Sequence, residues 1–208
     1  ANGHEVIVVT QAPPAREGAG VADGDGPVRV LRTGGDPEPM DTHDLLGRVA
    51  RMESAFTACG EDLLGTWSPD VIHAHDWMVS HAGAALRRAS GAPLVATIHA
   101  TEAGRNNGWV SNELSTRIHV VEAWLAQTAD AVITCSAAMS REVEQLFGVA
   151  GASVIANGID LTHWITPNGA AARMRARNAD AHPLLVYTGR VEWEKGVHTL
   201  VEAMPRLR

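Results

Sequence analysis

Two cationic side chains near the end of the chain have the types and spacing of an anion site. The stretch YTGRVEWEKGVHTL, residues 187–200, contains Lys195, the single lysine among 17 lysines and arginines. The apolar run LLVYTG, residues 184–189, comes directly before Arg190, so we expect a strand to end there and a helix to begin at Lys195. Ligands of open parallel sheets bind beyond the carboxyl ends of strands, beside helix N-termini whose free amides favour anions. Arg190 and Lys195 are therefore predicted to converge on one phosphate-sized space.

This pair of cations suits a diphosphate. Arginine supplies a planar fork of donors and lysine a compact point charge, and together they can bridge the oxygens of a pyrophosphate. The alternative interpretation is that both are solvated loop cations and that Lys195 pairs with Glu192 or Glu194. The use of lysine at this one position favours a functional role.

A second polar cluster follows another apolar run, in VIHAHDW at residues 71–77. His73 and His75 stand two residues apart and would share one face of a strand. They could ligate a metal ion as the histidine pair of a hydrolase does, with Asp70 or Asp76 as a further ligand.

The same cluster has two other interpretations. Asp76 and Trp77, just past the strand end, could form a sugar platform, in which a carboxylate accepts hydroxyl protons beside an aromatic face. Alternatively, the histidines are satisfied core residues and the tryptophan is buried.

Two further polar positions follow predicted strands. His99 ends a strand and precedes the polar loop of TIHATEAGRNNGW, residues 97–109, where it could hydrogen-bond a sugar hydroxyl or stabilise developing charge. A hydrogen bond to loop backbone is the other interpretation of His99. Asn157, in IANGIDLTHW at residues 155–164, is locally a turn residue, and it could face a cleft at a domain boundary.

The elements that would position these side chains alternate between strands and helices. Apolar, β-branched runs predict buried parallel strands near residues 5–10, 28–31, 70–75, 93–99, 131–136, 152–157 and 184–189. Helical periods span roughly 42–64, 78–90, 112–128, 138–147 and 196–208, and Ser111 or Asn112 can cap the third helix. The fold class is therefore α/β with βαβ crossovers. Residues 11–27 are predicted to form a mobile surface loop, and a domain boundary is expected within residues 158–183.

Composition narrows the function further. The net charge of −7 with no basic run argues against a nucleic-acid surface and favours small-molecule chemistry. Cys59 and Cys135 lack a C-x-x-C spacing and indicate buried free thiols in a reducing compartment, so a cytoplasmic location is the default. No apolar run or leader pattern predicts a membrane span or secretion.

Six stretches taken together carry a family resemblance. They are, in order, GHEVIVVT (3–10), DVIHAHDW (70–77), VATIHATEAG (95–104), ADAVITCSAAMSREV (129–143), NGID with a following tryptophan (157–164) and GRVEWEKG (189–196). In this order, over nearly the whole chain, they resemble the retaining, two-domain glycosyltransferases of the glycogen and starch synthase type, family 4 and its relatives.

The resemblance implies a GT-B fold, in which two Rossmann-like domains face a cleft. Residues 1–157 would be the acceptor-side domain, 158–183 a linker, and 184–208 the first strand and helix of the nucleotide-sugar domain. The resemblance also implies that an upstream strand and glycine loop, and the rest of the second domain, lie outside this chain. We therefore expect residues 1–208 alone to be a poorly folded and inactive fragment, because the strands flanking the first strand would lack partners.

The motif match also implies roles for single residues. Gly189, Arg190 and Lys195 would bind the donor diphosphate, and the two cations would stabilise the leaving group without a metal cofactor. The residues that would line the sugar and acceptor site are Asp76, Trp77, His99 and Asn157, with His99 also catalytic.

The leading hypothesis is transfer of glucose from a nucleoside diphosphate glucose to an α-glucan or related saccharide, with retention of configuration. Its partners would be the sugar nucleotide and the saccharide acceptor, without nucleic acid. Two alternatives remain: a metal-dependent hydrolase built on His73 and His75, and a sugar-nucleotide binding module without catalysis.

Overall fold

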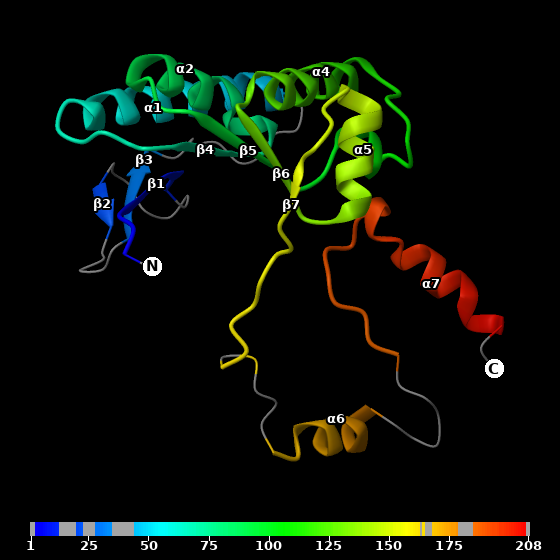
Figure 1. The fold of residues 1–208 in the computed structure, drawn as a ribbon. Helices are drawn as coiled ribbons and strands as arrows, with labels where there is room; N and C mark the ends of the chain where they lie inside the picture. Colours follow the sequence, from blue (N-terminus) through cyan, green and yellow to red (C-terminus); the bar gives the residue numbers. More distant parts are fainter. Residues whose placement is uncertain are drawn as a thin grey trace.

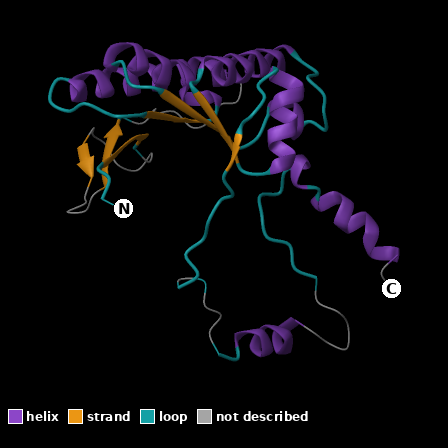
Figure 2. Ribbon diagram, viewed as in Figure 1, coloured by secondary structure: helices purple, strands orange, loops and turns teal. Residues whose placement is uncertain are grey.

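The structure is a computed structural model that describes residues 3–12, 20–22, 28–34, 44–162, 164, 168–178 and 185–206. Its strands are β1 (Val6–Gln11), β2 (Gly20–Ala22), β3 (Val28–Thr33), β4 (Ile72–His75), β5 (Leu94–Ile98), β6 (Ala131–Thr134) and β7 (Ser153–Val154). Its α-helices are α1 (Leu45–Leu64), α2 (Ser80–Ser90), α3 (Glu102–Arg105), α4 (Glu113–Thr128), α5 (Ala137–Phe147), α6 (Ala170–Asn178) and α7 (Val197–Ala203). Short 3-10 helices are η2 (Trp77–Val79), η3 (Trp193–Lys195) and η4 (Met204–Arg206). The α/β class predicted from the sequence is confirmed (Figures 1 and 2).

The larger sheet consists of β4, β5, β6 and β7, which pair in that order and all run parallel. The register pairs His75 with Thr97 and Thr97 with Ile133. Figure 1 shows α2 and α4 lying along one face of this sheet. Because parallel strands end at one edge, the segments after β4 and β5 are brought together there.

The core of this half lies between the sheet and its helices. Leu94 and Ala96 of β5, with Leu125 of α4 and Val143 of α5, are buried in one apolar cluster. Gly83 of α2 permits the close approach of helix and sheet, because a Cβ there would lie 3.2 Å from side-chain atoms of Ala74 and Leu94. Burial of these apolar side chains is the main driving force for docking the helices.

Local capping residues set the helix ends, and the cap predicted at Asn112 is confirmed. Asn112 caps α4, since its side chain accepts from the backbone N–H of Ser115 (2.8 Å). Ser136 caps α5 in the same way. Gly91 and Gly148 end α2 and α5 with φ values of 76° and 69°, a left-handed conformation that glycine adopts without steric cost.

The smaller sheet has the order β1-β3-β2. β1 and β3 are parallel, as predicted, and β2 is antiparallel to β3. The prediction of a mobile loop over 11–27 is wrong for Gly20–Ala22, because these residues pair with the edge of β3. Residues 13–19 and 23–27 of that loop lie outside the described part of the chain.

A cavity of about 340 Å³ separates the two sheets, with β1 on one side and β4 on the other. Apolar side chains of α1 and α2, among them Phe56 and Leu86, line it as well. Within the described residues, β1 pairs only with β3, and β4 pairs only with β5. Unpaired strand edges of this kind were expected on both sides of a central strand of a doubly wound sheet.

The end of the chain departs from the predicted strands. The run at 152–157 pairs only over Ser153–Val154, and residues 185–189 form no strand. A strand needs a neighbour for its backbone hydrogen bonds, and no described strand lies beside residues 185–189. The predicted boundary region 158–183 contains α6, and α7 with η4 forms the predicted last helix. Beyond β7 the chain runs away from the sheet to α6. It then returns close to α5 just before α7 begins (Figure 1).

Cys59 and Cys135 are free thiols, as predicted, but both are half-buried rather than buried. Burial raises the pKa of the Cys59 thiol, and the nearby Asp62 carboxylate adds to that rise. Among the described helices none combines the length and the apolar character needed to cross a membrane.

Replacement of Leu94 by alanine tests the position of the core. Leu94 is 0% exposed, so the substitution is expected to lower the free energy of unfolding by about 2–5 kcal/mol through lost burial and the cavity left behind. Urea denaturation of the full-length protein measures the change. The matched control is Leu161→Ala, where the side chain is 72% exposed and a change within about 0.5 kcal/mol is expected. Equal effects of the two substitutions would contradict this placement of the core.

Candidate functional site

Asp76 joins the carboxyl ends of β4 and β5. Its backbone N–H donates to the carbonyl oxygen of Thr97 (2.9 Å), and its Oδ1 accepts from the backbone N–H of His99 (2.8 Å). The φ of Asp76 is 62°, one of two positive values among the described non-glycine residues. Such a backbone costs about 1–3 kcal/mol and persists where the surroundings fix it, often at functional sites. The turn directs the carboxylate towards the end of the neighbouring strand.

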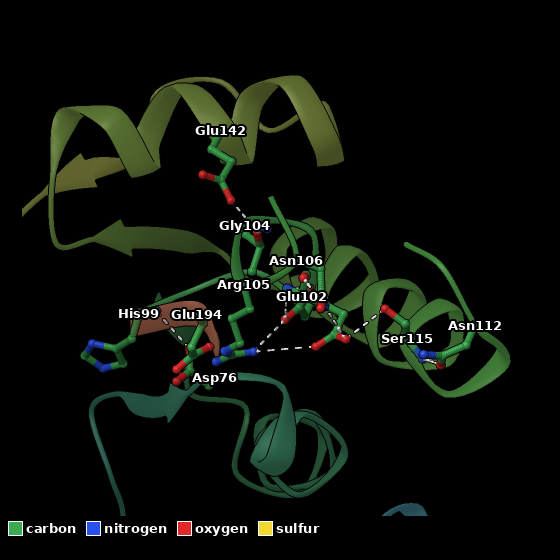
Figure 3. A network of polar contacts seen from close by, with 12 residues as sticks. Asp76, His99, Glu102, Gly104, Arg105, Asn106, Asn112, Ser115, Glu142 and Glu194 are labelled. Atoms are coloured by element: carbon green, nitrogen blue, oxygen red, sulfur yellow. Dashed lines mark hydrogen bonds and ion pairs between the residues drawn. The ribbon is translucent and has the colours of Figure 1, made fainter. Parts of the chain in front are cut away.

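Three histidine rings form a row beside this turn. The ring centroids of His73 and His75 are 4.2 Å apart, and those of His75 and His99 are 5.3 Å apart. Nδ1 of His75 lies 3.0 Å from Nε2 of His99, and Nε2 of His73 lies 2.7 Å from Oγ1 of Thr97. A ring-to-ring hydrogen bond needs one donor and one acceptor, so neutral imidazoles fit this row. The ring of His99 points away from the Asp76 carboxylate (Figure 3).

The surroundings keep His73 and His75 uncharged. Burial lowers the pKa of His73, and the neighbouring rings of His75 and His99 lower it further. Burial also lowers the pKa of His75, with His99 acting in the same direction and Asp76 in the opposite one. His73 and His75 are therefore neutral at pH 7, each with a free lone pair or N–H for hydrogen bonding.

The metal-site interpretation of the two histidines lacks a further ligand. In the part of the chain that the structure describes, no group of three or more His, Cys, Asp or Glu side chains could hold a metal ion. The nearest carboxylate in sequence, Asp76, is engaged with the backbone of His99. The row is built for hydrogen bonding between rings rather than for coordination.

Trp77 does not form the predicted sugar platform. Its side chain is 6% exposed and packs in an apolar cluster with Val49 of α1 and Ile118 of α4. The platform prediction is wrong because a large indole gains more from burial between two helices than from exposure at the sheet edge. Trp77 instead anchors the turn that carries Asp76.

Helix α3 begins with a capped turn. The hydroxyl of Thr101 accepts from the backbone N–H of Gly104 (2.9 Å) and donates to the Glu142 carboxylate of α5. Thr101 is fully buried, so this cap is protected from water. The loop after β5 is thereby fixed to α5 (Figure 3).

A buried carboxylate on α4 holds the same turn. Both oxygens of Glu122 accept from the backbone N–H of Glu102 (2.9 Å each), and Oε1 of Glu122 lies 3.6 Å from a guanidinium nitrogen of Arg105. Sequence reasoning did not select these residues. The available signal was position: Glu122 stands four residues after Ile118 and three before Leu125, on the buried face of α4.

The pKa of Glu122 is unusually high for a carboxyl group. Its side chain is 1% exposed, and burial raises its pKa from 4.5 to about 7. The hydrogen bond from the Glu102 backbone and the charge of Arg105 oppose the rise, while the Glu102 and Asp76 carboxylates support it. A buried carboxylate with a strongly shifted pKa beside a polar cavity is a functional-site signal.

Arg190 and Lys195 both contact the carboxylate of Glu194. Oε1 of Glu194 lies 3.2 Å from a guanidinium nitrogen of Arg190 and 3.2 Å from Nζ of Lys195. Glu192 contacts Arg190 at 3.6 Å. The pairing of Lys195 with Glu194 is the alternative interpretation made from the sequence, and the convergence of the two cations on a phosphate-sized space stays a prediction.

A polar cavity of about 420 Å³ joins this motif to α3. Its walls are Glu102, Arg105 and Asn106 on one side and Arg190, Glu192, Trp193 and Glu194 on the other. Figure 3 shows Glu194 near Arg105, which lines the same cavity. The folded chain thus brings the segment from Arg190 to Glu194 close to α3, which follows the strand end where His99 lies.

The two remaining predicted residues stand differently. Gly189 has a φ of 153°, and a Cβ there would lie 3.0 Å from the Tyr187 hydroxyl, so the turn into Arg190 requires glycine. That hydroxyl donates to the carbonyl oxygen of Arg190 (2.7 Å). Asn157 is exposed in the extended segment after β7, and no described contact joins it to Asp76 or His99.

Comparison with known proteins identifies the family. A model of Glycosyltransferase Family 4 matches residues 1–163. This chain belongs to Glycosyltransferase Family 4. Within the family, it is 43% identical over its whole length to a glycogen synthase of Mycobacterium tuberculosis, covering 51% of that protein. It is 31% identical over 99% of its length to an uncharacterized glycosyltransferase of Methanocaldococcus jannaschii, covering 52% of it. The chain thus spans about half the length of these curated relatives.

Solved structures of similar fold include a sucrose-phosphate synthase and the Anabaena protein HepE. A sucrose-phosphate synthase from Thermosynechococcus elongatus has a TM-score of 0.78 at 22% identity, over 99% of this chain and 51% of that one. The Anabaena protein HepE, in complex with UDP and glucose, has a TM-score of 0.58 at 19% identity, over 99% of this chain and 59% of that one. The architecture of this Family 4 chain is therefore that of the GT-B glycosyltransferases.

Replacement of Glu122 by glutamine tests the buried carboxylate. Because its folded pKa of about 7 exceeds the ordinary 4.5, the folded state retains a proton that the unfolded state releases between these pH values. Stability of the wild type should therefore fall as pH rises from about 4.5 to about 7 and level off above. E122Q cannot titrate, so its unfolding free energy relative to wild type should rise across that window, as measured by urea denaturation at a series of pH values.

The matched control is Glu144→Gln on the exposed face of α5, which should change stability by the same small amount at every pH. A pH profile of E122Q parallel to that of wild type would contradict the buried, proton-binding state of Glu122.

Proposed function

We propose that the protein carrying this chain transfers a glucosyl unit from a nucleoside diphosphate glucose to an α-glucan or related saccharide, with retention of configuration. The observation that carries the proposal is the convergence of Arg190 and Lys195 on one carboxylate oxygen, 3.2 Å from each, beside the end of the parallel sheet. A carboxylate oxygen and a phosphate oxygen are both anionic acceptors that can take hydrogen bonds from these donors.

Relatives support the choice of sugar and acceptor. The 43% identity to a protein named glycogen synthase extends over the whole chain, and the Anabaena protein of similar fold was solved with UDP and glucose. Other Family 4 relatives are named D-inositol 3-phosphate glycosyltransferase and alpha-maltose-1-phosphate synthase, at 26% and 29% identity. The higher identity and full coverage favour a glucan acceptor.

On the donor side, two cations would stabilise the leaving group. As the bond to the sugar breaks, negative charge develops on the diphosphate, and Arg190 and Lys195 would stabilise that charge more in the transition state than in the ground state. The released phosphate oxygen can then accept the proton of the attacking hydroxyl on the same face of the sugar. Gly189 lets the backbone turn towards this position without a side chain in the way.

On the sugar and acceptor side, the proposal assigns hydrogen-bonding roles. The ring of His99 would bond a sugar hydroxyl, since its Nδ1 is not used in the contact with His75. Asp76 holds the His99 backbone and has a second carboxylate oxygen for a hydroxyl proton. Asn157 would add a further hydrogen-bonding side chain from the extended segment after β7. Trp77 would contribute only by packing.

The two alternatives receive less support. A hydrolase built on His73 and His75 needs further metal ligands, and the described residues provide no such group. A binding module without catalysis would bind the sugar nucleotide but transfer nothing, so titration calorimetry paired with a transfer assay separates it from an enzyme. We propose a cytoplasmic protein that acts on a sugar nucleotide and a saccharide without a metal cofactor or nucleic acid.

Replacement of Lys195 by alanine tests the proposed function. In the full-length protein, loss of one preorganised charge donor should lower kcat by about a hundredfold or more in a glucosyl-transfer assay. The control is Arg206→Ala, an exposed cation past α7 that should leave kcat unchanged. A K195A variant with the kcat of wild type would rule out the assigned role.

A further inference from the structure

The carboxylate of Glu194 occupies the centre of a cationic group. Its Oε1 is shared by Arg190 and Lys195, and its side chain is 21% exposed, against 71% for Arg190 and 48% for Lys195. The most buried charge of this motif is therefore the anion. A carboxylate held in this way marks a position where a negative oxygen is stabilised.

A third cation, Arg105, faces the same cavity from α3. Arg105 of α3 and Arg190 both line the cavity of about 420 Å³ that Glu194 also lines. Figure 3 shows the Arg105 guanidinium and the Glu194 carboxylate lying near one another. The cavity is thus bounded by arginines on two separate elements, with a carboxylate of the chain between them.

Arg105 is held in place for this position. One guanidinium nitrogen lies 3.6 Å from the buried Glu122 carboxylate and 4.0 Å from Glu102. Glu102 belongs to α3 itself and Glu122 is buried on α4, and the Arg105 side chain remains 31% exposed. A guanidinium has five donors in a planar fork, so two carboxylate contacts leave donors for a further anion.

We propose that this cavity is a binding subsite for a phosphate-type anion, which displaces the Glu194 carboxylate and contacts Arg105 as well as Arg190. The proposal rests on the proposed function, in which Arg190 and Lys195 bind a diphosphate, and it extends that site to a residue of α3. Glu194 then acts as a counter-ion that keeps the cations together while the site is empty.

Charge balance explains why the carboxylate has to move. Three carboxylates and two guanidiniums line the cavity, so the walls repel an added anion while Glu194 stays in place. Rotation of Glu194 towards solvent leaves Arg190 and Lys195 with donors directed at one point, and a phosphate group with more oxygens and more charge satisfies them better. Exchange of one anion for another also avoids leaving the cations unpaired.

The experiment is titration calorimetry of the full-length protein with inorganic diphosphate in metal-free buffer. Glu194→Gln removes the competing charge and keeps the shape of the side chain, so we expect about tenfold tighter binding than in wild type. Glu202→Gln, an exposed carboxylate on α7, is the matched control and should change the affinity by less than about twofold.

Arg105→Ala tests the contribution of α3. It should weaken diphosphate binding about tenfold, because the bound anion would contact that guanidinium. In the double variant it should also reduce the gain that E194Q produces, because the two side chains line the same cavity. Arg88→Ala on the exposed face of α2, away from this cavity, is the control and should leave the affinity unchanged. Circular dichroism of each variant checks that the fold is retained.

Two results would overturn this subsite. One is an E194Q variant that binds diphosphate no tighter than wild type or E202Q, and the other is an R105A variant with wild-type affinity. Failure of the proposed function has a different signature, namely unchanged glucosyl transfer by K195A. That result does not decide the outcome of the diphosphate titrations of E194Q and R105A.

Discussion

Parallel pairing of β4 with β5 is the constraint on which the proposed site depends. Because both strands end at the same edge, Asp76 and the segment from His99 to α3 start side by side, and the Asp76 carboxylate joins them through the His99 backbone. Trp77 then anchors this turn in the apolar cluster with α1 and α4. If this pairing shifted by one residue, His73 and His75 would turn to the opposite face of the sheet.

Buried and half-buried carboxylates organise the cations of the site. Glu122 holds the start of α3 and a guanidinium nitrogen of Arg105, and Glu194 holds Arg190 together with Lys195. These contacts orient long, flexible side chains before a ligand arrives, which lowers the entropy lost on binding. The same contacts compete with an anionic ligand, so preorganisation and affinity oppose one another here.

Family membership and geometry answer different questions. Membership of Glycosyltransferase Family 4 follows from the match over residues 1–163. The neighbours of similar fold, such as a sucrose-phosphate synthase, share the architecture at 22% identity and do not define an acceptor. Under the proposed function, the choice among acceptors would depend on side chains at the sheet edge, in particular His99, Asp76 and the residues of α3.

The local sequence pattern alone predicted most strands and helices of this protein and the places of several polar residues along the chain. The apolar runs at β1, β3, β4, β5 and β6 and the helical periods of α1, α2, α4 and α5 are signals of side-chain spacing, and Asn112 at the start of α4 is a local capping signal. The positions of Asp76 and His99 after strands followed from the same patterns. Such features depend on residues close in sequence, so they can be recognised without the tertiary structure.

Contacts between distant residues were decided only by the tertiary structure. The burial of Trp77, the clamp of Glu122 on α3 and the meeting of Arg105 with the Arg190 segment each join residues far apart in the chain. The absence of a strand at 185–189 has the same cause, because an apolar run becomes a strand only where another strand supplies its hydrogen bonds. Spacing in a sequence shows which residues could pair, while packing of the helices on the sheet decides which of them do.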